Sequence, residues 1–455
     1  MEKEFYKKLT APYEAKMMET LKDFIAIDST YDETTVDEEN PFGEGVSKAL
    51  QFIAEVAKKD GFIVNNYGNY VVEILTNEED KNITIMAHAD IVPVGTGWPQ
   101  DPFEMVEKDG FLYARGVADD KGPLLSCYYG LKALKDNGLL GKYQVRFLVG
   151  GNEERGSACM EHYFHTLKKK QPTYGFSPDS AYPLTYAEKG IIGFTVKKKI
   201  NFPEVKSIKG GVASNAVIEK CEVLLKEDLN FISYLNEQGA DYSYLAKGEE
   251  MLLTFNGVAA HGSIPWMGKN AAIDAIKYLG AYYKNADFKK LYELLEDPRG
   301  AGVNAAATSE NMGTNSLNVG IISYENDELE VVVNYRHVET VKAEDMIANI
   351  KKAAKPFEIE VEGISPLLFY PKDSPLITTL LKVYQEETGD YKTEIIASGG
   401  GTYAKEADNV VAFGMEYPGH DPKMHGVNEN TKREYLVESM GIYAHAIVEL
   451  GKLIK

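Results

Sequence analysis

Residues 83–90 read Ile-Thr-Ile-Met-Ala-His-Ala-Asp, a short apolar run that ends in a histidine and an aspartate two positions apart. An apolar run of this length is typical of a buried β-strand. Because alternate side chains of an extended chain share a face, His88 and Asp90 should point the same way where this strand ends. The stretch therefore predicts a central strand that brings a polar pair to one edge of a sheet.

Further strands are expected on either side of this one. Apolar runs at 70–75, 145–149 and 174–176 predict strands, and helical spacing at 124–135 and 158–167 predicts helices between the later ones. Strand–helix–strand alternation is typical of an α/β fold with a mixed or largely parallel central sheet and helices on both faces. Such sheets bind ligands beyond the carboxyl ends of their strands.

The pattern changes near residue 187 and returns after Pro371. The intervening part combines a helix at 270–283 with a hairpin over 316–336, which is typical of an α+β domain. A chain of 455 residues is also too long for one hydrophobic core. We expect a first domain in two segments, interrupted by an inserted domain, with these boundaries: 1–186, 187–372 and 373–455.

Composition excludes several classes of partner. The formal net charge is −20, which disfavours nucleic acids and anionic membranes as partners. The sequence contains no run of about 18 apolar residues, so no membrane span is expected. Residues 1–9 lack the apolar core of a secretion signal. The cysteines at 127, 159 and 221 are scattered, as in proteins of a reducing compartment. We expect a soluble cytoplasmic protein without a cysteine-built metal site.

Acidic pairs follow two of the expected structural elements. Asp119 and Asp120 stand just before the helix expected at 124–135, where one of them could simply cap the helix. Glu153 and Glu154 follow the strand at 145–149, so that one could bind a metal while its neighbour faces a substrate. The residues by themselves do not separate the two members of either pair.

Two more polar positions complete the set. Asp179 follows the strand expected at 174–176, although turn geometry alone would explain an aspartate there. His425 lies in a late loop before the final helix, in a chain with only eight histidines. Together with His88, these side chains would meet at one sheet edge. Histidines combined with carboxylates suit zinc, manganese or cobalt, and suit calcium poorly.

The polar motifs, taken together, resemble those of a known enzyme family. The sequence is similar to the co-catalytic zinc peptidases that include aminoacylase, carnosinase and succinyl-diaminopimelate desuccinylase, and it looks most like the bacterial PepV-type dipeptidases. The matching motifs occur in the family's order at 87–93, 116–123, 152–157, 178–179 and 424–426. They extend over nearly the whole chain. The resemblance implies a zinc-exopeptidase-like catalytic domain that carries an inserted lid domain.

The resemblance implies two divalent metal ions per chain, zinc first, with manganese or cobalt as alternatives. The implied ligands are His88, Asp120, Glu154, Asp179 and His425. Asp120 would bridge both ions. His88 and Asp179 would complete one site, and Glu154 and His425 would complete the other.

The resemblance also implies catalytic roles. Glu153 would be the general base for a water held between the two metals, and Asp90 would orient His88. His261, in the inserted domain, would donate to the developing oxyanion.

Substrate-binding residues follow from the same resemblance. Arg336 would hold the C-terminal carboxylate of the substrate, for which a guanidinium group is geometrically suited. Asn215 could assist it. Gly400, Gly401 and Thr402 match a turn where the backbone approaches the ligand closely.

The expected activity is hydrolysis of the amide bond of unblocked dipeptides. One alternative is an N-acyl-amino-acid deacylase that uses the same site, and another is a non-catalytic protein that binds peptides or metals. The inserted domain is longer than the lid of dimeric relatives, so we expect a monomer in which His261 acts within its own chain.

Overall fold

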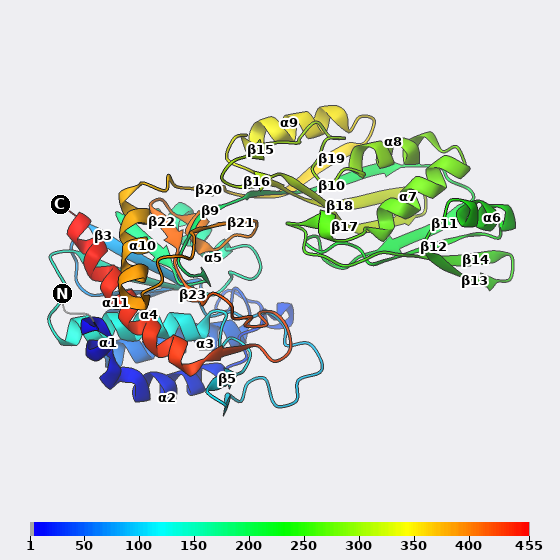
Figure 1. Cartoon of the computed structure of the whole chain (residues 1–455). Helices are drawn as coiled ribbons and strands as arrows, with labels where there is room; N and C mark the ends of the chain where they lie inside the picture. Colours follow the sequence, from blue (N-terminus) through cyan, green and yellow to red (C-terminus); the bar gives the residue numbers. More distant parts are fainter. Residues whose placement is uncertain (1–3, 455) are drawn as a thin grey trace. The chain divides into compact units, whose positions relative to one another are not determined.

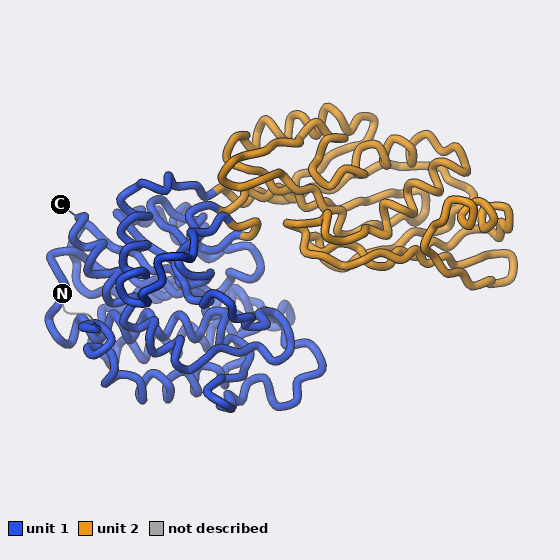
Figure 2. The backbone as a smooth tube through the Cα atoms, viewed as in Figure 1, with its two compact units in different colours: residues 1–187, 368–397, 401–455 blue, residues 188–367, 398–400 orange. Residues whose placement is uncertain are grey.

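The computed structural model describes residues 4–454 and divides into two compact units, coloured separately in Figure 2. Unit 1 contains the described residues up to Ala187, Leu368–Ala397 and the chain from Gly401 on, and unit 2 contains Glu188–Leu367 and Ser398–Gly400. The second boundary lies five residues before the one expected after 372. The reason is that residues 368–369 form a strand of the sheet of unit 1.

Unit 1 is built on a mixed sheet. Its strands, in spatial order, are β1 (Ile63–Tyr67), β2 (Val71–Leu75), β6 (Gln144–Gly150), β3 (Asn82–His88), β7 (Tyr174–Ser177), β22 (Val410–Ala412), β9 (Thr185–Glu188) and β20 (Leu368–Phe369), with β21 (Ile396–Ser398) also paired to β9. β3 runs parallel to β6 and β7, whereas β2 pairs antiparallel with β1 and β6. The strands expected at 70–75, 83–87, 145–149 and 174–176 are confirmed to within one residue at each end.

Helices cover this sheet. They are α1 (Phe5–Thr10), α2 (Glu14–Ile25), α3 (Glu44–Lys59), α4 (Lys121–Asp136), α5 (Ala158–Glu161), α10 (Pro375–Thr388) and α11 (Arg433–Leu453), shown in Figure 1. All seven side chains of β3 are buried. Because alternate side chains of a strand point to opposite faces, both faces of the sheet must be covered at this strand. Helix α4 packs closely against α11, since a Cβ atom on Gly130 would lie 2.6 Å from the Met440 carbonyl oxygen.

Short elements complete unit 1. They are the three-stranded sheet of β4 (Val106–Lys108), β5 (Phe111–Tyr113) and β24 (Asn430–Lys432), and the pair of β8 (Ser180–Ala181) and β23 (Met415–Glu416). The helix expected at 158–167 is only partly regular, because α5 continues as a π-helical turn over His162–Thr166. No helix in the described part of the chain is long and apolar enough to cross a membrane.

The order of the central strands decides where the site lies. β3 is flanked by β6 and β7, all parallel, with His88 opposite Gly150 and Ile85 opposite Phe176. The carboxyl ends of these strands therefore meet at one edge of the sheet. Each is followed by one of the polar motifs identified in the sequence.

Unit 2 contains an antiparallel sheet. Its strands, in spatial order, are β13 (Tyr242–Lys247), β14 (Glu250–Asn256), β12 (Lys220–Lys226), β11 (Val205–Gly210), β17 (Ser316–Glu325), β18 (Glu328–His337), β10 (Gly190–Lys199) and β19 (Glu358–Ser365). The expected hairpin is confirmed as β17 and β18. Its loop is the pair Asn326 and Asp327, both with positive φ (53° and 65°), as a two-residue loop with a right-handed strand twist requires.

The helices of unit 2 pack on this sheet and share its core. They are α6 (Leu229–Glu237), α7 (Ala271–Tyr282), α8 (Ala286–Leu295) and α9 (Ala343–Ala353). Between α8 and α9 the chain forms a small pair of strands, β15 (Thr308–Ser309) and β16 (Gly313–Thr314). Strand β14 alternates buried and half-buried residues, which is the pattern of a sheet covered on one face.

Candidate active site

The candidate metal ligands lie at the sheet edge of unit 1. His88 is the last residue of β3, Glu153 and Glu154 follow β6, and Asp179 follows β7. His425 lies in the loop between β23 and β24. Segments that are far apart in sequence are therefore brought together because their strands are neighbours in one sheet.

One half of the site surrounds His88, which is fully buried. Its Nε2 lies 2.9 Å from Oδ1 of Asp119 and 3.7 Å from Oδ2 of Asp179. The ligand atoms of these three residues lie within 4.8 Å of one another, a spacing that could hold a metal ion.

The other half surrounds His425, whose side chain is 57% exposed. Its Nε2 lies 3.0 Å from Oδ2 of Asp119 and 3.2 Å from Oε2 of Glu154. These three residues form a second group of potential ligands with the same spacing. Asp119 therefore belongs to both halves and offers one oxygen to each.

Asp120, which was predicted to be the shared carboxylate, belongs to neither group of potential ligands. Helix α4 begins at the next residue, and the Asp120 side chain is turned toward the backbone of β3. There its Oδ2 accepts the backbone N–H of His88 at 3.0 Å. Neighbouring residues at a helix start project in different directions, so that Asp119, and not Asp120, lies within reach of both histidines.

Asp90 contacts both His88 and the loop that carries Glu153 and Glu154, and the second contact was not predicted from the sequence. The Nδ1 of His88 lies 2.9 Å from the backbone carbonyl of Asp90 and 3.4 Å from its carboxylate. The carboxylate instead accepts the backbone N–H groups of Glu153 and Glu154, each at 3.1 Å. A proton on Nδ1 donated to the carbonyl leaves Nε2 to act as a ligand. Asp90 thus orients His88 and also anchors the acidic loop after β6.

The electrostatics of the cluster indicate that added positive charge would stabilise it. Burial, and then the neighbouring carboxylates, raise the pKa of Glu153, Glu154 and Asp179 above their usual range. Burial likewise raises the pKa of Asp120 to about 8. Burial acts in the same direction on Asp119, but hydrogen bonds from the two histidines outweigh it and hold its pKa low.

Unsatisfied atoms give the same indication. Oε1 of Glu154 and Oδ1 of Asp120 are buried and have no hydrogen-bond partner. A buried carboxylate oxygen without a partner is costly, and a cation would compensate it. The donor set, imidazole nitrogens with carboxylate oxygens, fits zinc, manganese or cobalt. The residues present therefore fit a pair of divalent ions.

Glu153 differs from its neighbour. The structure gives the Glu154 carboxylate a contact with His425, whereas no hydrogen bond or ion pair to the Glu153 carboxylate is found within residues 4–454. Its backbone is held by Asp90. Glu153 also belongs to neither group of potential ligands. The structure thus separates the two glutamates that the sequence alone left equivalent.

Tyr403 is a residue that the sequence did not identify. It is fully buried in unit 1, and its ring packs edge-on against that of His88, with centroids 6.1 Å apart. Its hydroxyl accepts the backbone N–H of Asn152 at 3.3 Å and lies 2.9 Å from Sγ of Cys159. The tyrosine therefore supports both β3 and the loop that carries the glutamates.

The candidates of the inserted domain lie in unit 2. His261 is exposed, and its Nδ1 lies 2.7 Å from Oγ of Ser263. Asn215 is close to it: the Asn215 carbonyl accepts the N–H of Gly262 at 2.7 Å, and residue 216 forms an isolated bridge with His261. The structure thus places these two predicted residues together.

Arg336 lies at the end of β18 and is 3% exposed. Its guanidinium donates to Oδ1 of Asn334 at 2.8 Å and to the carbonyl of Gly399. No carboxylate is paired with it in the described part of the chain. Burial lowers its pKa to about 10, so it still carries its charge at neutral pH.

The predicted glycine turn is divided between the units. Gly400 belongs to unit 2, where its N–H donates to Oγ of Ser398 at 3.0 Å. Gly401 and Thr402 belong to unit 1, and the Thr402 hydroxyl accepts the N–H of Ala404 at 3.1 Å, which caps the short helix at Tyr403–Glu406.

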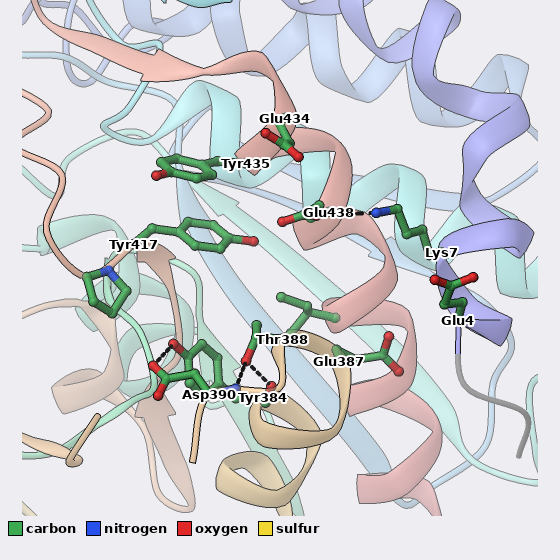
Figure 3. Close-up of a pocket in the computed structure, with 12 residues that line it drawn as sticks. Glu4, Lys7, Tyr384, Glu387, Thr388, Asp390, Tyr417, Glu434, Tyr435 and Glu438 are labelled. Carbon is green, nitrogen blue, oxygen red and sulfur yellow. Dashed lines mark hydrogen bonds and ion pairs between the residues drawn. The ribbon is translucent and has the colours of Figure 1, made fainter. Parts of the chain in front are cut away.

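A separate hollow in unit 1, of about 420 Å³, is lined by aromatic and acidic side chains (Figure 3). Glu438 there is paired with Lys7 at 3.3 Å, and Asp390 accepts the Tyr384 hydroxyl at 2.9 Å. No histidine is found among the described residues that line it. The hollow therefore lacks the mixed ligand set found at the sheet edge.

Sequence comparisons give a family and several relatives. Residues 84–449 match peptidase family M20/M25/M40. The YtjP protein of Bacillus subtilis, provisionally named a dipeptidase, is 32% identical over 449 residues, which cover 95% of this chain and 96% of that protein. A Staphylococcus haemolyticus protein with the same provisional name is 31% identical over 468 residues, which cover 98% and 99%.

Solved structures share the fold at lower identity. The dipeptidase Dug1p of Saccharomyces cerevisiae matches with a TM-score of 0.60 at 17% identity, over 99% of this chain and 98% of that one. Human carnosine dipeptidase 1 gives 0.58 at 14% identity, over 98% and 99%. An M20 family metallo-carboxypeptidase of Sulfolobus solfataricus gives 0.60 at 18% identity, over 96% and 100%. The expected α/β fold with an inserted α+β domain is confirmed.

Proposed function

Because the chain belongs to peptidase family M20/M25/M40, we propose that it is a metal-dependent dipeptidase that hydrolyses unblocked dipeptides. The family resemblance read from the sequence motifs is confirmed. The observation that carries the proposal is that Asp119 lies between two groups of potential ligands. The provisional names of the relatives give the same class of substrate.

The proposed metal centre holds two divalent ions, zinc first, with manganese or cobalt as alternatives. His88 and Asp179 would hold one ion, Glu154 and His425 the other, and Asp119 both. When bound, such ions supply Lewis acidity that activates water and polarises the scissile carbonyl.

Glu153 is the proposed general base. It would take the proton of the attacking water and return it to the leaving amine, so that the amine departs neutral. A carboxyl group whose pKa is raised by burial is suited to accepting a proton at neutral pH. Its backbone is fixed by Asp90, which keeps the group oriented without consuming the carboxylate.

Substrate recognition is assigned to Arg336, with His261 as the donor to the oxyanion and Asn215, Gly400 and the neighbouring turn in support. The support for Arg336 is its buried, charged guanidinium with no carboxylate partner in the described residues. A buried positive charge of this kind gains from binding an anion. Binding of the terminal carboxylate would limit substrates to short peptides.

Metal removal should abolish dipeptide hydrolysis, and the substrate panel should define the activity. We expect turnover of unblocked dipeptides to fall to background after dialysis against a chelator, and to return with zinc, manganese or cobalt. The measurement is the release of amino acids from a dipeptide panel, with metal content determined before and after chelation. Cleavage of N-acetyl amino acids without cleavage of dipeptides would instead establish a deacylase. Turnover that survives complete metal removal would contradict the proposal.

Arg336→Lys should weaken substrate binding. A lysine keeps the charge but loses the forked geometry that matches a carboxylate, so we expect KM for dipeptides to rise roughly 10-fold or more. The matched control is a dipeptide amide, which lacks the carboxylate. The wild type should cleave the amide poorly, and the substitution should change that rate little. Equal losses on the acid and the amide would contradict the assignment.

The proposal includes a cytoplasmic monomer, in which His261 acts within its own chain. The length of the inserted segment, greater than that of the lid of dimeric relatives, supports the monomer. Sedimentation at low micromolar concentration tests it, and an obligate dimer would contradict it.

A further inference from the structure

A buried ion pair lies next to the candidate metal ligands. Nη1 of Arg115 lies 2.6 Å from Oε2 of Glu429, and both side chains are 1% exposed. Burying two charges is expensive and is offset only by good geometry and further hydrogen bonds. The positions of those further hydrogen bonds therefore indicate what the pair does.

The carboxylate of Glu429 holds the segment that carries the shared ligand. Its Oε1 accepts the backbone N–H of Ala118 at 3.0 Å and that of Asp119 at 3.2 Å. Two adjacent amide groups bound to one oxygen fix the direction in which the chain approaches helix α4. This contact acts directly on the residue whose two oxygens face the two histidines.

The guanidinium of Arg115 reaches the other segments of the site. Its Nη2 donates to the carbonyl of His425 at 3.3 Å, and lies 3.4 and 3.5 Å from the carbonyls of Pro93 and Val94, which follow β3. The group also lies over the ring of Trp98, 5.4 Å from its centroid. One side chain thus connects the loop of a candidate ligand with the segment after His88 and Asp90.

Local structure explains why the pair forms. β5 and β24 pair antiparallel, with Tyr113 opposite Asn430. The ladder continues past the strands, since the N–H of Ala114 donates to the carbonyl of Glu429 at 3.2 Å. Arg115 and Glu429 are 314 positions apart in sequence but become neighbours at the end of this ladder.

We propose that Arg115 and Glu429 are positioning residues that set the spacing between Asp119 and His425. The inference rests on the proposed metal centre. Neither side chain is a candidate ligand, and each acts through the backbone of a residue that is. The pair would keep the two halves of the site at the separation that a shared carboxylate requires. Without it, the His425 loop and the Asp119 segment would no longer be joined by these buried hydrogen bonds.

The test uses Co²⁺ as the probe, because its visible absorption reports the ligand geometry as well as the occupancy. Metal-free full-length protein is titrated with Co²⁺ for the wild type, Glu429→Gln and Arg115→Lys. Glu429→Gln keeps the shape and removes the charge, while Arg115→Lys keeps the charge and removes the fork. We expect both variants to bind Co²⁺ about 10–100-fold more weakly, with altered absorption bands, as is typical when outer partners of metal ligands are lost.

The matched control is Glu73→Gln. Glu73 is another buried carboxylate of unit 1, 6% exposed, which accepts hydrogen bonds from Asn65, Tyr67 and Tyr163 and contacts none of the candidate ligands in the described residues. Its loss should lower thermal stability and leave Co²⁺ affinity and spectrum as in the wild type.

The outcomes separate this inference from the proposed function. Wild-type Co²⁺ affinity and spectrum in folded Glu429→Gln and Arg115→Lys would overturn the inference, as would an equal loss in Glu73→Gln. If Glu429→Gln does not fold, as judged by circular dichroism, Arg115→Lys decides. A wild type that binds Co²⁺ but hydrolyses no dipeptide would overturn only the proposed function. A wild type that binds no Co²⁺ would overturn both.

Discussion

Glu153→Gln should abolish hydrolysis while leaving metal binding intact. The amide is nearly the same size but cannot accept the proton of water, and general-base catalysis is typically worth about 10²–10⁴-fold in rate. We therefore expect kcat to fall by at least about 100-fold, with metal stoichiometry as in the wild type. The structure supports this separation, because no hydrogen bond or ion pair joins the Glu153 carboxylate to the candidate ligands among residues 4–454, whereas the Glu154 carboxylate is paired with His425.

The measurement for Glu153→Gln is steady-state turnover of a dipeptide together with metal analysis of the purified variant. Glu161→Gln is the matched control, since Glu161 is exposed on α5 a short distance along the same segment. It should behave as the wild type. Unchanged turnover in Glu153→Gln would show that another group is the base, and loss of metal would show that Glu153 is a ligand.

Asp119→Asn and Asp120→Asn should have unequal effects. An asparagine offers a single carbonyl oxygen, so Asp119→Asn cannot give one oxygen to each half of the site. We expect it to lose metal and to lower kcat/KM by more than about 100-fold, beyond the 10–100-fold that is typical of an outer partner. Asp120→Asn keeps an oxygen that can accept the N–H of His88. It should therefore lower metal affinity and kcat/KM by no more than the 10–100-fold typical of a residue that supports a ligand without binding the metal.

The comparison is made by metal analysis and turnover of the two variants in parallel, so that each is the control for the other. They are adjacent, both are buried, and each substitution replaces a carboxyl group with an amide of the same size. A greater loss of metal in Asp120→Asn than in Asp119→Asn would restore the assignment implied by the sequence resemblance. Equal loss would mean that the total negative charge, rather than the bridging position, decides metal binding.

In this acidic site, backbone N–H groups help to hold the loops that bear the candidate ligands. Asp90 and Glu429 are both carboxylates, yet each is directed at backbone N–H groups of the segments that bear ligands. An amide donor satisfies the Asp90 carboxylate without adding a competing cation to the site, whereas Glu429 is also paired with Arg115. The two residues thus stabilise the loops that bear the candidate ligands through contacts to their backbone.

Local sequence determined most of the fold. The apolar runs before His88 and before Glu153 predicted β3 and β6 with their ends correct to one residue, because buried strands require continuous apolar segments. The alternating apolar residues over 316–336 likewise predicted the β17–β18 hairpin, because alternation is typical of paired strands. The sequence also indicated which segments carry polar residues at the sheet edge.

Tertiary structure decided how individual side chains are used. Which of Asp119 and Asp120 faces both histidines depends on how the chain enters α4, and that entry is held by Glu429. Spacing along the chain contains no information on this, because adjacent side chains diverge at a turn. The pairing of Arg115 with Glu429 also exists only once β5 and β24 are joined. Periodicity fixes strands and their ends, whereas contacts between distant segments fix the direction of each functional group.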